Sequence, residues 1–122
     1  DYFFRKCDRE LKAMSPLFLG GLTARAIRLK DILEFRKIKI FETYPGYQAR
    51  RLGLIQLGYK KRKKTIPVLA KKIQKQFRLK LMKESIKDWH HLDALLALIA
   101  AIRFQKGKTL SFGNRREGVI RI

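Results

Sequence analysis

The sequence contains almost no cysteine, and this scarcity limits the chemistry open to the chain. Cys7 is the single cysteine among 122 residues. One thiol forms no intrachain disulfide and cannot build a cysteine cluster around a metal ion. Because folding without disulfides is typical of reducing compartments, the sequence predicts a cytoplasmic location. Phe4, Leu11 and Met14 share an apolar stripe with Cys7, which favours a core position for the thiol over a nucleophilic role.

Long hydrophobic runs are also missing. The longest nearly apolar stretch, residues 92–102, is too short to cross a bilayer and is interrupted by Asp93. The sequence has no glycine-rich phosphate loop, no Gly-x-Ser-x-Gly elbow and no His-Glu-x-x-His pair. We therefore expect no membrane-spanning segment. The sequence also lacks the common motifs of nucleotide hydrolases, esterases and zinc proteases.

Acidic residues are scarce, whereas basic residues are abundant. The chain has 10 Asp and Glu against 30 Lys and Arg, a formal net charge of +20. Such an excess makes the compact state repel itself, so it favours a role in association. Nucleic acid is the partner we expect, because each neutralised phosphate releases counterions. An anionic membrane surface and an acidic protein are the alternatives.

The basic residues gather in the middle of the chain. A run of cations follows Gly58 and Tyr59, and a predicted helix beginning at Thr65-Ile66-Pro67 extends it. Core packing is favoured for Tyr59 over stacking on a base. The predicted nucleic-acid-binding residues are Arg50, Arg51, Lys60, Lys61, Arg62, Lys63, Lys64, Lys71 and Lys75.

Hydrophobic periodicity predicts a single domain over residues 1–122 that is α/β and helix-rich. Apolar spacings of three and four predict the helices, whereas alternation over residues 36–43 predicts one central strand. A C-terminal hairpin is expected around Gly113-Asn114. The predicted helices cover residues 2–14, a segment capped by Thr23, residues 47–52, a segment starting at Thr65, and residues 89–104 capped by Asp88.

Asp93 is the first candidate site residue. The helix that carries it is apolar nearly all round, and burying an ionised carboxylate costs several kcal/mol unless it is paired or binds a metal. The alternative is that the helix N-terminus or an arginine satisfies it. His90 lies three residues earlier and so on the same helix face, although it could equally pack beside Trp89.

Glu42 is the second candidate carboxylate. It ends the predicted strand on the face of Ile38 and Ile40, before the Pro45-Gly46 turn. A surface ion pair with a lysine is the alternative. Together with Asp93 and His90, Glu42 could bind Mg²⁺ or Mn²⁺ for phosphodiester cleavage.

The order of short motifs resembles a domain-of-unknown-function family of predicted nucleases. This family is assigned an RNase H-like fold, similar to RuvC and YqgF resolvase-type proteins. The resemblance spans nearly the whole chain and is most specific at the Glu-x-Tyr-Pro and His-x-x-Asp-Ala-Leu segments. The matching segments are residues 5–11, 22–25, 41–46, 51–53, 58–60 and 91–97.

The resemblance implies a role for each candidate. Glu42 would be the acidic residue that ends the central strand, and Asp93 that of the C-terminal helix, with His90 beside it as a ligand or proton-transfer group. The metal would be Mg or Mn. Arg5, Asp8 and Arg9 match a family motif to which the resemblance gives no role.

The sequence departs from RNase H-like enzymes at its start. These enzymes carry a first metal-binding Asp on their first strand, which is expected to precede Asp1. The chain is therefore expected to be the C-terminal portion of such a domain, inactive alone, and to pair as a homodimer or with a missing N-terminal segment. A non-catalytic nucleic-acid-binding module and a basic protein-interaction module are the alternative functions.

Overall fold

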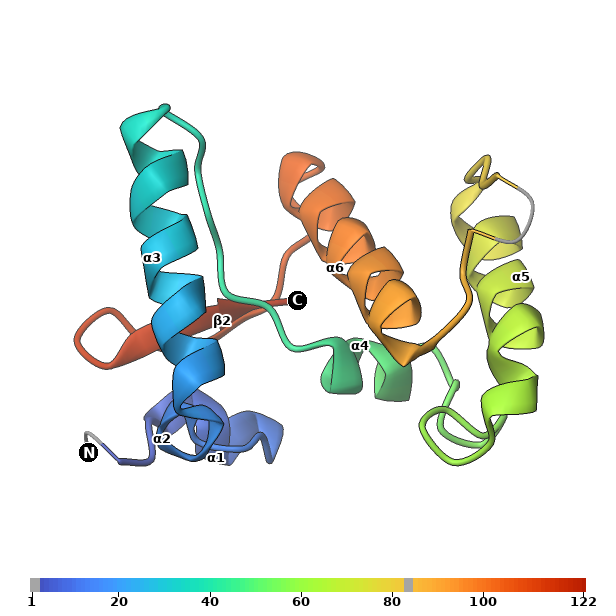
Figure 1. Ribbon diagram of the computed structural model, residues 1–122, viewed down its shortest axis with the longest axis horizontal. Coiled ribbons are helices and arrows are strands. Elements are labelled where there is room, and N and C mark those ends of the chain that lie inside the picture. The colour runs from blue at the N-terminus through green and yellow to red at the C-terminus, as the bar shows by residue number, and fades with distance from the viewer. Residues whose placement is uncertain (1–2, 83–84) are drawn as a thin grey trace. The chain divides into compact units, whose positions relative to one another are not determined.

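The structure is a computed structural model that describes residues 3–82 and 85–122 (Figure 1). It is helix-rich and mixed α/β, with one two-stranded antiparallel sheet among the described residues. The chain divides into two compact units, and each is described by itself. Unit 1 consists of residues 1–43 and 110–121, and unit 2 of residues 44–109 with Ile122. The single domain predicted over residues 1–122 stays a prediction.

Three helices form the N-terminal part of unit 1. These are α1 (Lys6–Leu11), α2 (Pro16–Leu19) and α3 (Gly21–Phe35). The helix predicted over residues 2–14 is shorter than expected, and its first residue lies outside the described residues. Lys12 ends α1 because it takes a left-handed conformation with φ of 54°. The Ser15 hydroxyl accepts a hydrogen bond from the Leu17 amide and so caps α2.

The α3 helix packs against α2 but buries none of its residues. Thr23 does not cap it as predicted, because the Thr23 hydroxyl donates to the Pro16 carbonyl at 2.9 Å and α3 starts at Gly21. Leu22, Ile27 and Leu29 each remain more than half exposed.

The central strand predicted over residues 36–43 does not form. In the described part of unit 1, this segment pairs at one position only, where Glu42 makes a parallel bridge with Ile120. The Arg121 amide donates to the Glu42 carbonyl at 2.8 Å. Alternation of side chains decides which face each residue takes, but a strand also needs a partner along its length. Ile38, expected on a buried face, is 48% exposed.

The predicted C-terminal hairpin is confirmed. Strands β1 (Ser111–Asn114) and β2 (Gly118–Arg121) pair in antiparallel register, and α1 packs on them. The turn is displaced from the predicted Gly113-Asn114 to the residues between the strands. There the Asn114 side-chain oxygen accepts a hydrogen bond from the Glu117 amide at 2.8 Å, which fixes the turn.

Unit 2 contains the predicted helices close to the predicted places, as α4 (Pro45–Arg51), α5 (Ile66–Phe77) and α6 (Trp89–Gln105). A 3₁₀ turn that was not predicted, η1 (Lys63–Thr65), precedes α5. The Asp88 carboxylate accepts from the His91 amide at 2.9 Å and caps α6 as predicted. Its pKa lies below its usual range because it accepts this bond.

The core of unit 2 is formed where α4 and α5 meet α6 (Figure 1). Leu69 and Ile73 of α5 and Leu92, Leu96 and Ile99 of α6 are buried within it. No helix in the described ranges is both long enough and apolar enough to cross a membrane.

Candidate nucleic-acid interface and carboxylate clusters

The predicted nucleic-acid-binding residues all lie in unit 2, and all are exposed. We call them the basic residues of unit 2. They occupy the last turn of α4, the segment leading into η1, η1 itself and the outer face of α5. The sequence has no Asp or Glu between residues 43 and 83. Lys60 pairs with Asp93, but no acidic residue lies within this stretch itself, so the stretch presents a positive field to anionic partners.

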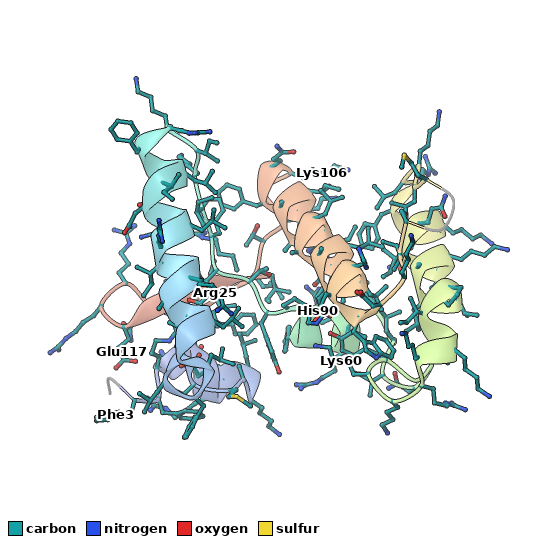
Figure 2. All side chains as sticks on the ribbon, in the orientation of Figure 1. Phe3, Arg25, Lys60, His90, Lys106 and Glu117 are labelled. Atoms are coloured by element: carbon teal, nitrogen blue, oxygen red, sulfur yellow. The ribbon has the colours of Figure 1, made fainter. Side chains whose placement is uncertain are left out.

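Asp93 is half-buried and tied to the start of the basic segment. Its carboxylate lies 2.7 Å from the Lys60 ammonium and accepts a hydrogen bond from the Tyr59 hydroxyl. Figure 2 places Lys60 and His90 near the N-terminal end of α6. The carboxylate is thus satisfied by a lysine and a tyrosine, rather than by the helix N-terminus or an arginine.

Tyr59 takes the predicted core position. It is buried and meets Trp89 edge-on, with the ring centroids 5.7 Å apart. Burial, followed by the hydrogen bond to Asp93, raises the pKa of Tyr59 above its ordinary value. The phenol therefore remains a neutral hydrogen-bond donor to Asp93 at physiological pH.

The two histidines of α6 have separate environments. The Nδ1 atom of His91 lies 2.8 Å from the Asp88 carboxylate. His90 is exposed, so it does not pack as a buried partner of Trp89. His90 and Asp93 lie three residues apart on α6 and therefore share a helix face, as predicted.

Glu42 belongs to a charged cluster in unit 1 that we call the Arg5 clamp. One Arg5 guanidinium contacts the Glu42 carboxylate at 2.7 and 2.8 Å and the Asp8 carboxylate at 2.8 and 2.9 Å. These hydrogen bonds, with that to Glu42 the larger cause, raise the pKa of Arg5 above its ordinary value. Asp8 is almost fully buried, whereas Glu42 is 45% exposed. Glu42 therefore forms an ion pair, as the alternative expected, but with an arginine of α1's N-cap.

The Arg5 clamp gives a physical reason for the motif that the resemblance left without a role. The Asp8 carboxylate also accepts a hydrogen bond from the Arg5 backbone amide at 3.1 Å, which satisfies this amide at the N-cap of α1. Arg9 donates to the Phe4 carbonyl. Cys7 lies next to Asp8 and is fully buried, and burial raises the pKa of its thiol. All of these contacts hold α1 in place.

The donor chemistry of the three candidate ligands suits Mg²⁺ or Mn²⁺, which prefer carboxylate oxygens. Glu42 belongs to unit 1, and Asp93 and His90 belong to unit 2. Over residues 3–82 and 85–122, no group of three or more His, Cys, Asp or Glu is placed to hold a metal ion. Each carboxylate is already paired with a cationic side chain that a metal ion would have to displace.

The sequence did not reveal a pocket at the N-terminal end of α5. It has a volume of about 820 Å³ and lies entirely within unit 2. Ile66 and Pro67 of α5 form one wall, and Leu81 and Ile86 of the following segment contribute apolar surface. The basic run 60–64 indicated charge here, but no sequence pattern indicated a concavity.

No protein-family model matches the sequence, and no curated protein or solved structure shows significant similarity to it. The resemblance to RNase H-like nucleases therefore rests on the short motifs alone.

Proposed function

We propose that the chain binds the phosphate backbone of nucleic acid through the basic residues of unit 2. The observation that carries this proposal is a stretch without acidic residues, 43–83, whose predicted cations are all exposed. Exposed lysines and arginines neutralise phosphates without the cost of desolvating a buried charge, and the release of counterions drives binding. Lys60 is the exception, because it is paired with Asp93.

Removing part of this charge should weaken binding and flatten its salt dependence. We expect replacement of Lys61, Arg62, Lys63 and Lys64 by glutamine to reduce the slope of log affinity against log salt by about 0.9 for each lost phosphate contact on duplex DNA. Fluorescence anisotropy of a labelled oligonucleotide over a salt series measures both quantities.

A matched control removes the same charge from unit 1. Arg25, Arg28, Arg36 and Lys39 are exposed there, in a region that also contains Asp31 and Glu34. Their replacement by glutamine should change the slope less than the variant in unit 2 does. Equal losses in both variants would show that only the net charge matters, and salt-independent binding would contradict the proposal.

In line with the resemblance, we also propose that this binding serves a metal-dependent nuclease of RNase H-like fold. Glu42, Asp93 and His90 would hold Mg²⁺ or Mn²⁺, which activates water for phosphodiester hydrolysis when bound. The Arg5 and Lys60 contacts would keep the two carboxylates oriented until then. The support for this step is the Glu-x-Tyr-Pro and His-x-x-Asp-Ala-Leu motifs.

A non-catalytic nucleic-acid-binding module is the second candidate. The observation that favours it is the cationic partner on each carboxylate, because a side chain that is already paired needs no metal ion. In such a module, the Arg5 clamp and the Lys60–Asp93 pair would serve stability alone.

Two conservative substitutions distinguish these candidates. We expect Glu42→Gln or Asp93→Asn to abolish Mg²⁺- or Mn²⁺-dependent cleavage and to leave nucleic-acid affinity within about twofold, since the altered groups lie outside the basic residues that release counterions. Cleavage of labelled strands on denaturing gels, with Asp31→Asn as an exposed control, provides the measurement. Full cleavage by both variants would refute the assigned site, whereas binding without any cleavage by the unaltered protein would establish the non-catalytic module.

A further inference from the structure

The pocket beside α5 combines two properties that the proposed function does not use. Its walls are largely apolar, as described above. Four lysines also line it: Lys63, Lys64, Lys71 and Lys87. No Asp or Glu is among the lining residues that the structure describes. An occupant that is anionic at one end and apolar at the other would match these described walls.

We propose that this pocket binds an unpaired nucleotide of a single-stranded nucleic acid. This inference rests on the proposed binding function and narrows its substrate class. In a duplex the bases are stacked on one another and expose only their edges in the grooves, so no base can enter the pocket and its apolar wall would stay uncovered. A single strand can place its base in the pocket and keep its phosphate on the lysines.

The size and position of the pocket agree with this occupant. A volume of about 820 Å³ lies within the roughly 300–1,000 Å³ range of small-ligand sites, so a base with its sugar can enter. The first turn of α5, at Ile66 and Pro67, forms part of the wall, and the helix dipole favours negative charge there. Lys71 lies one turn further along the same helix.

The nature of the walls also determines the kind of selectivity. The lining residues that the structure describes include no aromatic side chain, so the base would be held by aliphatic contact and desolvation rather than by ring stacking. Such contacts tolerate every base. We therefore expect a preference for single strands over duplex on the order of tenfold, the gain from burying roughly 55 Å² of apolar base surface, with little dependence on sequence.

A matched pair of substitutions on α5 tests the pocket directly. Gln74 lines it, whereas Gln76 is exposed on the same helix and lies outside it. Changing either residue to glutamate adds one negative charge with little change in shape. We expect Gln74→Glu to weaken binding of a labelled single strand about tenfold more than Gln76→Glu does, and both to weaken duplex binding equally.

A second comparison separates the pocket from net charge. One variant replaces the four pocket lysines with glutamine. The other replaces the exposed lysines Lys61, Lys72, Lys75 and Lys80, which lie outside the lining. Both lose the same charge, so duplex affinity should fall alike, whereas the preference for single strands should disappear only in the pocket variant. Thermal unfolding shows whether each variant remains folded.

The outcomes separate this inference from the proposed function. If the unaltered protein binds neither single strands nor duplex, the proposed function fails and the inference with it. If it binds both but Gln74→Glu and Gln76→Glu behave alike, the nucleotide pocket is refuted while backbone binding stands. Binding to phosphatidylserine vesicles that Gln74→Glu abolishes, without any preference for single strands, would assign the pocket to a lipid and overturn the inference.

Discussion

Replacing Arg5 with alanine is expected to lower the free energy of unfolding by roughly 3–5 kcal/mol. The Asp8 carboxylate is 1% exposed and would lose both contacts with the guanidinium, while keeping the Arg5 amide and a weak, 3.9 Å contact with the Cys7 thiol. A buried charge without its partner is strongly destabilising, and whole domains are stable by only about 5–15 kcal/mol. Glu42 would lose its contacts too, but it is exposed and its share is small.

Urea denaturation at neutral pH measures this effect. Arg28→Ala removes an exposed arginine on α3 and should stay within about 0.5 kcal/mol of the unaltered protein. Adding Asp8→Asn to Arg5→Ala should recover part of the loss, because no buried charge is then left unpaired. If Arg5→Ala is as mild as Arg28→Ala, the clamp does not support unit 1.

Replacing Gly113 with alanine should cost roughly 3 kcal/mol or more, because strain and overpacking act together. An added Cβ atom would lie 2.4 Å from the Gly118 carbonyl oxygen and 2.8 Å from the Cys7 Cβ atom. The backbone at Gly113 also has φ of +92°, where a side chain is strained. The hairpin and α1 would have to move apart to accept the methyl group.

Gly107→Ala separates these two causes. Gly107 has φ of +66° with open space around it, so this variant should cost only about 1–2 kcal/mol from the backbone. Thermal unfolding compares the variants. The reactivity of the Cys7 thiol provides a second measurement, since it should rise in Gly113→Ala if α1 separates from β1. Equal losses of stability in both variants would contradict the close contact.

Predictability differed between the two units for a physical reason. The α5 and α6 helices begin where local signals place them, at Pro67 in the first turn of α5 and after the Asp88 cap of α6. Such signals act over one or two turns and are visible in the sequence. The strand predicted over residues 36–43 failed because the alternation that indicated it contains no information about a pairing partner.

The same difference between local and long-range information applies to the candidate carboxylates Asp93 and Glu42. The sequence indicated that Asp93 must be partnered, because its helix is apolar. It could not name Tyr59, which lies 34 positions away, and it could not name Arg5 as the partner of Glu42, 37 positions away. The neighbouring sequence shows whether a carboxylate needs a partner, whereas the identity of that partner depends on how distant segments of the chain pack.

The sequence by itself determined the excess of positive charge and its concentration between residues 43 and 83, because these follow from composition. It also determined the presence and position of the main helices, because short-range periodicity is sufficient to predict them. Only the tertiary structure decided that Arg5 holds Asp8 and Glu42 together, that Lys60 and Tyr59 satisfy Asp93, and that apolar walls and lysines enclose a pocket at the start of α5. Each of these features joins residues that no local rule connects, and only close packing of the folded chain brings them into contact.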